Sequence, residues 1–329
     1  GRKVAMVSIL EVQDLTKYYG TQLAVDRTSF SIESGEIFGF LGPNGAGKTT
    51  TINMLTGLAR PTTGKIYYFG QDYTQNIKKA QHLMGIVPDE SNLYPELSGF
   101  ENLCFCGALY GLKKKERESR AKDLLEVFGL SDAMDKKFSA YSRGMKRRLT
   151  IAAGIIHKPP ILFLDEPTTG IDVASARHIR RLLLEMNKNG TTIFLTTHYI
   201  EEAERLCHRV AFIVEGRIIK IDHTDNLLHP VKDRNILLLT LSKIEDGIET
   251  RLSAILPEIR CVRTSDNEIK IESIRPLRVA QIIRILEENN IEVIEARRMT
   301  PSLEDVFVDV TGIEAETMKK EKEKKEGQG

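Results

Sequence analysis

The feature that most constrains this sequence is a glycine-rich segment joining a predicted strand, residues 35–41, to a predicted helix that continues to about Leu58. The segment reads Gly42-Pro43-Asn44-Gly45-Ala46-Gly47-Lys48-Thr49-Thr50. Glycines at this spacing let backbone N–H groups surround a phosphate, while the helix directs its positive end at the same point. Lys48 would then reach the β- and γ-phosphate oxygens and the Thr49 hydroxyl a Mg²⁺ ion. We therefore predict a P-loop for a nucleoside triphosphate; the alternative is a glycine-rich turn followed by a chance Lys-Thr pair.

The composition excludes several classes of protein. The 329 residues hold 47 Lys and Arg against 46 Asp and Glu, a net charge of +1. This balance argues against nucleic acid held by bulk charge, and we expect no nucleic-acid partner. No apolar run approaches the roughly 18 residues that cross a bilayer. The four cysteines lack the spacing of metal ligands, which fits reduced thiols in a cytoplasmic protein.

Two later segments predict strands of a parallel sheet. Ile161–Leu164 is apolar and too short for a helix, and residues 191–196 repeat this pattern after a predicted helix at Ser175–Asn187. Asp165 and Glu166 follow the first of these strands. Beside a P-loop, one carboxylate can hold Mg²⁺ and the other can face the attacking water, so we assign Asp165 to the metal and Glu166 as general base. Read alone, such an acidic pair is more often the start of a turn.

Changes in the pattern divide the chain into four parts. Residues 8–222 alternate strands and helices, with a mostly helical stretch at about 90–158, and the polar residues 223–233 predict a linker. Residues 234–313 read strand–helix–strand–strand–helix–strand, which is typical of a small α+β domain of the split-βαβ kind. The Lys- and Glu-rich residues 314–329 should be disordered.

Several motifs in a consistent order mean that residues 8–222 resemble the ATPase subunit of ABC transporters. The P-loop has that family's Gly-x-x-Gly-x-Gly-Lys-Thr-Thr form. Residues 165–172, Asp-Glu-Pro-Thr-Thr-Gly-Ile-Asp, resemble its Walker B strand running into the D-loop, and Thr196-Thr197-His198 resembles its switch histidine. Tyr19 matches the aromatic residue that stacks on adenine in the family, although it could also be an ordinary aromatic of an edge strand.

Two motifs depart from the family pattern. The signature, usually Leu-Ser-Gly-Gly-Gln, is here Tyr141-Ser142-Arg143-Gly144-Met145. Ser142 can donate to a phosphate oxygen and Gly144 leaves its N–H approachable at a helix start, although the string could also be only a helix cap. In the Q-loop, Asp89 follows Val87-Pro88 where the family usually has glutamine. Asp89 keeps an oxygen that could meet Mg²⁺ or the attacking water, or it is only a loop acid.

The resemblance implies an α/β fold: a P-loop NTPase cassette with a RecA-like core, an N-terminal antiparallel β subdomain and a helical subdomain, then a small C-terminal α+β domain. It also implies an ATPase whose cassettes, as a homodimer or a mixed pair, sandwich ATP and Mg²⁺ head to tail. A separate multi-span membrane permease would hold the cassettes at the cytoplasmic face of the cell membrane. The residues implied are Lys48, Glu166 and His198 for catalysis; Tyr19, Gly42, Pro43, Asn44, Gly45, Ala46, Gly47, Lys48, Thr49, Thr50 and Asp172, with Ser142 and Gly144 from the second cassette, for ATP; and Thr49, Asp165 and Asp89 for the metal.

The region after residue 233 indicates which branch of the family this sequence resembles. Residues 300–307, Thr-Pro-Ser-Leu-Glu-Asp-Val-Phe, resemble the ending of ATPase subunits of the drug- and antibiotic-export (ABC-2 type) branch. One alternative is an ABC-type ATPase that acts on ribosomes or DNA; such proteins usually have two cassettes or long coiled coils, which this sequence lacks. A P-loop kinase, the other alternative, would need an acceptor pocket and would not need Ser142 or His198.

Overall fold

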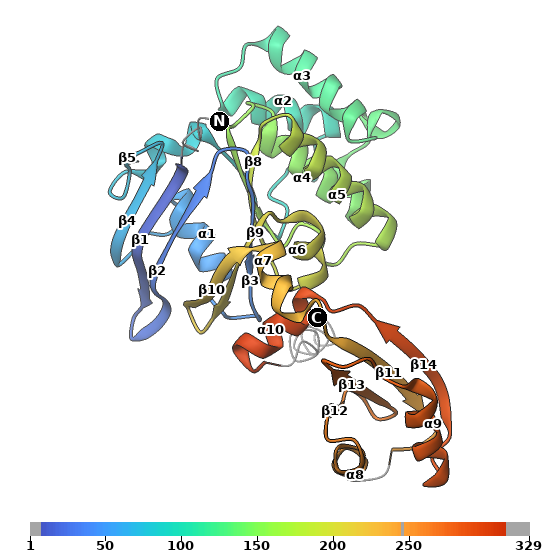
Figure 1. Ribbon diagram of the computed structural model, residues 1–329. Coiled ribbons are helices and arrows are strands. Elements are labelled where there is room, and N and C mark those ends of the chain that lie inside the picture. Colours follow the sequence, from blue (N-terminus) through green and yellow to red (C-terminus); the bar gives the residue numbers. More distant parts are fainter. Residues whose placement is uncertain (1–7, 245–246, 314–329) are drawn as a thin grey trace, which may run out of the picture. The chain divides into compact units, whose positions relative to one another are not determined.

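The computed structural model describes residues 8–244 and 247–313 and divides into two compact units (Figure 1). The first unit ends at His223, and the second covers Thr224–Gly312. The tail at 314–329, for which we expected disorder, lies outside the described residues.

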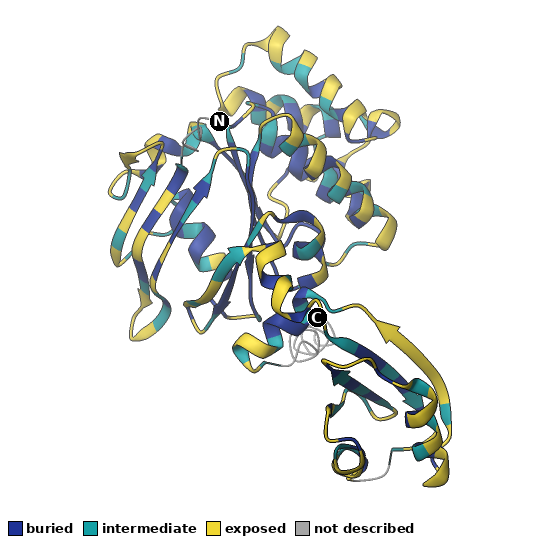
Figure 2. Cartoon of the chain, viewed as in Figure 1, coloured by how far each residue is buried: buried dark blue, intermediate teal, exposed yellow. Residues whose placement is uncertain are grey.

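The centre of the first unit is a six-stranded sheet with the order β10-β9-β3-β8-β7-β6. Strands β9, β3, β8, β7 and β6 are parallel, and β10 is antiparallel to β9. Every residue of β3, β7 and β8 is buried (Figure 2), which explains their uninterrupted apolar sequences. The strand bounds are β3 Ile37–Leu41, β6 Met84–Val87, β7 Ile161–Asp165, β8 Thr192–Thr197, β9 Arg209–Val214 and β10 Arg217–His223.

A second, antiparallel sheet covers one face of the central sheet. It has the order β2-β1-β4-β5, with bounds β1 Ser8–Tyr19, β2 Gln22–Glu33, β4 Thr63–Tyr68 and β5 Gln71–Asp72. Phe30 on β2 stacks on Phe38 of β3 at 5.5 Å between ring centroids and on Phe194 of β8 at 6.1 Å. Strand β1 continues to Tyr19 through an irregularity at Asp14, where a left-handed backbone breaks the alternation.

Helices complete the first unit. Helix α2 begins with a capping box: Ser98 accepts from the backbone of Glu101, whose side chain accepts from the Ser98 N–H. Helices α2, α3 and α4 occupy the stretch that the sequence indicated as mostly helical. The bounds are α1 Lys48–Thr56, α2 Gly99–Leu109, α3 Lys114–Val127, α4 Arg143–Ile155, α5 Val173–Lys188 and α6 Ile200–Leu206, with 3₁₀ turns at Ile77–Leu83, Ser131–Ala133 and Phe138–Ala140.

The second unit is a four-stranded antiparallel sheet in the order β12-β13-β11-β14 with its own buried core. Each of its six predicted segments forms the expected element, and the order is that of a split βαβ fold. Residues 224–231, inside the stretch predicted as a linker, instead form a helix and a 3₁₀ turn because Leu227 and Val231 are buried. The bounds are α7 Thr224–Leu228, 3₁₀ turn His229–Val231, β11 Asn235–Leu241, α8 Ile248–Ile255, β12 Ile259–Arg263, β13 Glu268–Ser273, α9 Val279–Glu288, β14 Val293–Met299 and α10 Leu303–Thr311.

The last helix, α10, carries the motif at residues 300–307. Ser302 and Asp305 form a capping box at its start, and Lys270 of β13 donates to Asp305. Arg234 donates to Asp309 at 2.5 Å, one turn further on. The motif therefore fastens α10 to the sheet of the second unit.

Candidate active site

The chemistry-bearing residues gather at one edge of the central sheet. Strands β3, β6, β7 and β8 are parallel, so their carboxyl ends meet at that edge. The P-loop follows β3, Asp89 lies two residues after β6, Glu166 follows β7 and His198 follows β8. The fold thereby brings together four segments that are far apart in the sequence.

The P-loop owes its path to two glycines that nothing larger could replace. A Cβ on Gly42 would lie 2.1 Å from the carbonyl oxygen of Ile213, and one on Gly47, whose φ is +100°, would lie 2.6 Å from that of Ala24. Lys48 is buried, and its Nζ donates to the carbonyls of Gly42 at 2.8 Å and Pro43 at 3.1 Å. This ammonium therefore lies inside the curve of the loop.

The rest of the loop is more open. Asn44, Gly45 and Thr49 are exposed, Pro43 and Thr50 are half-buried, and Ala46 is buried. The Thr49 hydroxyl thus lies at an accessible place at the start of α1.

Glu166 is the centre of a buried polar cluster. Its Oε2 atom lies 2.8 Å from Nδ1 of His198 and accepts from the Thr169 hydroxyl at 3.0 Å, while Oε1 lies 3.5 Å from Nζ of Lys48. Glu166 has a φ of +48°, in the left-handed region that residues with a side chain seldom adopt. Its backbone N–H donates to the Thr196 carbonyl at 3.1 Å, so a conformation that costs free energy is held by several contacts.

The cluster keeps Glu166 ionised. Burial alone would raise the pKa of this carboxyl, but the hydrogen bond and charge of His198, with Lys48 and Thr169, hold its pKa below the ordinary value. Burial lowers the pKa of Lys48, which the carboxylates of Glu166, Asp165 and Asp89 partly offset. A carboxylate with a depressed pKa remains a proton acceptor at neutral pH.

The candidate metal ligands are carboxylate and hydroxyl oxygens, which Mg²⁺ prefers. Asp165 is buried and accepts a hydrogen bond from the Thr196 hydroxyl, whereas Asp89 is exposed. Within the described residues, no group of three His, Cys, Asp or Glu side chains could hold a metal ion. Mg²⁺ in nucleotide sites is usually bound by one or two carboxylates together with phosphate oxygens, so the residues present fit it without a dedicated cage.

The signature segment starts helix α4 and meets α5 of the same chain. Ser142 is exposed and caps α4, accepting from the Met145 N–H at 3.3 Å. Gly144 is buried, and a Cβ there would lie 2.2 Å from the hydroxyl of Ser175. The structure thus gives Gly144 an intrachain packing role, and the approachable N–H that we expected from the sequence stays a prediction.

The remaining predicted ligands lie at the surface. Tyr19 ends β1 with about half of its surface exposed, and Nζ of Lys17 lies 4.8 Å from its ring centroid. Asp172 is exposed and caps α5, accepting from the Ser175 N–H at 2.9 Å, and these bonds lower its pKa. Asp172 is therefore the N-cap of α5.

Two buried residues of the site were not singled out from the sequence. Arg147 lies on the inner side of α4 and donates to backbone carbonyls near Asp89 and Glu166. Glu202 on α6 accepts from the Thr168 hydroxyl at 2.6 Å, and burial raises its pKa. The sequence signal was weak in both cases, because each residue sits in a helix among other charged side chains.

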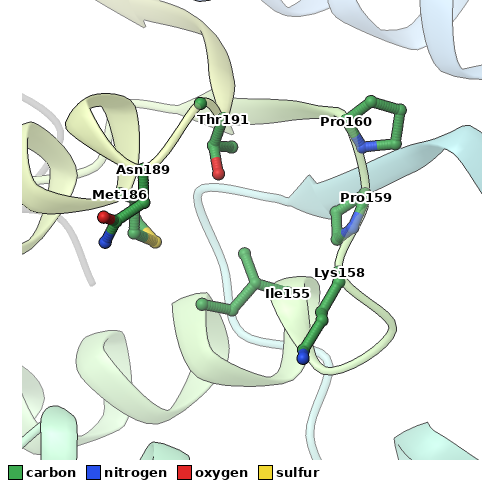
Figure 3. A pocket seen from close by; sticks show the side chains of 8 residues that line it. Ile155, Lys158, Pro159, Pro160, Met186, Asn189 and Thr191 are labelled. Atoms are coloured by element: carbon green, nitrogen blue, oxygen red, sulfur yellow. The ribbon is translucent and has the colours of Figure 1, made fainter.

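A pocket on the opposite edge of the sheet is separate from this cluster. It lies where β7 and β8 begin and is lined by Ile155, Pro159, Met186, Asn189 and Thr191, among others (Figure 3). The carboxyl ends of the same strands carry Glu166 and His198, so this pocket has no part in the site described above.

Comparison with known proteins identifies the family. The family described as "ABC transporter" matches residues 25–169. The linearmycin resistance ATP-binding protein LnrL of Bacillus subtilis is 37% identical over 307 residues, which cover 92% of this chain and 98% of LnrL. The chain belongs to the ABC transporter family. It is an ATP-binding cassette subunit, an ATPase.

Other relatives agree with this assignment of the cassette. The bacitracin transport ATP-binding protein BcrA of Bacillus licheniformis is 35% identical over 93% of this chain and 98% of BcrA. A solved ATP-binding subunit of an ABC transporter superposes with a TM-score of 0.62 at 30% identity, covering 68% of this chain and 93% of that one. The dimeric cassette MJ0796 bound to ADP and Pi gives a TM-score of 0.61 at 26% identity, covering 65% and 98%. These likenesses confirm the predicted fold class and the transporter ATPase over the ribosome- or DNA-directed alternative.

One further finding concerns membranes. None of the helices among residues 8–244 and 247–313 combines the length and the apolar character needed to cross a bilayer.

Proposed function

We propose that this cassette hydrolyses ATP with Glu166 as general base and that the energy drives export through a separate membrane permease. The observation that carries the proposal is the cluster in which Glu166 meets both His198 and the P-loop Lys48. Water attacks the γ-phosphorus while the bond to the bridging oxygen of ADP breaks, and Glu166 accepts the proton of that water. Inorganic phosphate and ADP are the products.

The neighbouring residues have separate roles in this proposal. Lys48 balances the charge of the β- and γ-phosphates, and the P-loop N–H groups surround them. His198 fixes the orientation of the Glu166 carboxylate and can donate to the γ-phosphate from its other ring nitrogen. Tyr19, exposed at the end of β1, stacks on the adenine. Asp172, at the start of α5, lies beside the site of the facing cassette.

Magnesium would be held by the Thr49 hydroxyl and Asp165, with Asp89 as a further oxygen donor within reach of the Lys48 charge. The ion would supply positive charge to the triphosphate oxygens during transfer. Thr196 orients Asp165 for this role by donating to its carboxylate.

The assembly proposed is a head-to-tail dimer. The P-loop lies at the edge of a sheet, so a bound triphosphate would be covered on one side only, and the exposed N-cap Ser142 is suited to cover the other side from a second cassette. Solved cassettes of this family have been found as dimers. ATP would hold two copies together and hydrolysis would release them.

Export is the direction we propose. LnrL is named for linearmycin resistance and BcrA for bacitracin transport, and both match this chain over more than nine-tenths of their length. The permease would then hold the dimer at the cytoplasmic face of the membrane.

Substitution of the base tests the proposal. We expect Glu166→Gln to keep ATP binding, to lower turnover by roughly 10²–10⁴-fold and to elute as a dimer in ATP and Mg²⁺ on gel filtration. Glu201→Gln, at an exposed position paired with Arg205, is the matched control and should behave as wild type. A Glu166→Gln protein that turns over normally, or that stays monomeric in saturating ATP, would contradict the proposed mechanism.

A further inference from the structure

Arg147 is a buried cation whose contacts converge on the candidate active site. It lies on α4 with 7% of its surface exposed. Its Nη2 atom donates to the Asp165 carbonyl at 2.5 Å and its Nε atom to that of Pro167 at 2.9 Å. Its Nη1 atom donates to the carbonyls of Pro88 and, at 3.0 Å, of Asp89. One guanidinium thus binds four carbonyls at the ends of the paired strands β6 and β7 and in the segments that follow them.

Two of these carbonyls bracket Glu166. The Asp165 carbonyl belongs to the peptide before Glu166, and the Pro167 carbonyl to the peptide one residue beyond it. Glu166 has a left-handed backbone, which costs on the order of 1–3 kcal/mol and persists only where the surroundings fix it. Arg147 therefore holds the turn that aims the Glu166 carboxylate.

The charges around Arg147 support the same role. Burial lowers the pKa of its guanidinium, and the carboxylates of Asp89, Asp165, Glu166 and Glu202 oppose that shift. Four carboxylates therefore lie near enough to interact with this one buried cation. Arg148, the next residue, donates instead to carbonyls of Phe128 and Gly129, away from this cluster.

We propose that Arg147 is a positioning residue for hydrolysis, which fixes the backbone around Glu166 and joins it to the segment carrying Asp89. This inference rests on the proposed role of Glu166. The fork of arginine is what the arrangement requires, since a lysine ammonium has the charge but only one nitrogen and cannot reach four separate carbonyls. The side chain itself does not contact ATP.

Three variants of the full-length chain separate geometry from charge. Arg147→Met removes both, Arg147→Lys keeps the charge, and Arg120→Gln is the control. Arg120 also donates to a backbone carbonyl, that of Ile156, but at the far end of α4. We would measure the folded fraction by circular dichroism, then kcat and KM for ATP per folded protein.

For Arg147→Met we expect kcat to fall about 10–100-fold with KM changed less than about threefold, because the base is misplaced while the P-loop is intact. Arg147→Lys should recover only part of kcat, because it keeps the charge but not the fork of donors. Should Arg147→Met not fold, Arg147→Lys decides the matter by its reduced kcat.

The inference is overturned if Arg147→Lys has the kcat of wild type, or if Arg147→Met loses activity only in proportion to its folded fraction, as the control should. An inactive wild-type chain, or a Glu166→Gln variant with normal turnover, would instead remove the proposed function itself. The two failures are therefore distinguishable.

Discussion

Two features of Glu166, its burial and its left-handed backbone, cost free energy at a position suited to catalysis. A buried carboxylate with a left-handed backbone is unfavourable in two respects, and the structure offsets both with Lys48, His198 and Thr169. The depressed pKa of Glu166 means that its ionised form stabilises the fold above the ordinary carboxyl pKa. That contribution is lost as the pH falls through the depressed value.

His157 offers a test of pH dependence at a site without proposed chemistry. Its ring stacks on Tyr110 at 3.5 Å between centroids, and Nε2 lies 2.9 Å from the Met84 carbonyl. Burial lowers its pKa from 6.5 to about 4, so the folded protein keeps this ring neutral.

The unfolded chain binds the proton first, so we expect stability to be complete above pH 6.5 and to fall between pH 6.5 and about 4. Because the ring is partly exposed, the loss should be roughly 1–2 kcal/mol, less than the full shift implies. Urea unfolding of wild type and His157→Phe across this range would measure it. Equal pH slopes for the two proteins would show that His157 does not titrate as described.

At the scale of elements, the contact between the first turns of α4 and α5 depends on a missing side chain. Gly144 lets Ser175 approach very closely. A Cβ added to Gly144 would lie 2.2 Å from the hydroxyl oxygen of Ser175 and 2.7 Å from the Cβ of Ser175. The two helix starts carry Ser142 and Asp172 as their caps. The spacing of these two caps is therefore set by packing within the chain.

We expect Gly144→Ala to cost about 1–3 kcal/mol, the usual cost of overpacking, despite the better helix propensity of alanine. Ser175→Gly in the same chain should relieve most of the clash, because it removes both atoms that the new Cβ meets. Thermal melts of the single and double variants would measure this. A Gly144→Ala protein as stable as wild type would mean that the helices can move apart freely.

At the scale of the whole molecule, two hydrophobic cores share no residue. One lies between the two sheets of the first unit and includes Phe38 and Phe194, and the other fills the second unit around Leu252 and Ile271. The residues of the candidate active site all belong to the first unit.

Two separate cores predict two unfolding transitions in calorimetry. Leu252→Ala, at a fully buried position, should destabilise the second unit by about 2–5 kcal/mol and shift only one transition. ATP should raise the other transition, because ligand binding stabilises only the unit that contains the site. A single transition that both changes shift together would show that the units unfold as one.

Much of this arrangement could be predicted from the sequence, because the signals that predict it are local. The glycines around Lys48 require a particular backbone, the apolar runs of β7 and β8 fit only buried parallel strands, and alternating segments gave the four strands and two helices from β11 to β14. Such signals lie within a few residues of one another. The helix α7, inside the stretch predicted as a linker, shows the limit of this approach, since the few apolar residues at 224–231 become informative only when a partner surface such as α10 is present.

The sequence by itself determined that a P-loop, an acidic pair and a histidine end three strands of one sheet, because each motif is contiguous and its chemistry follows from residue type. Only the tertiary structure decided that His198 and Lys48 hold the same carboxylate, that Gly144 makes room for Ser175, and that Arg147 joins Asp89 to the turn at Glu166. These contacts join residues between 18 and 118 positions apart or depend on the side that a helix turns inward. No local pattern encodes them, since they arise when the strands align and bring their ends to one edge.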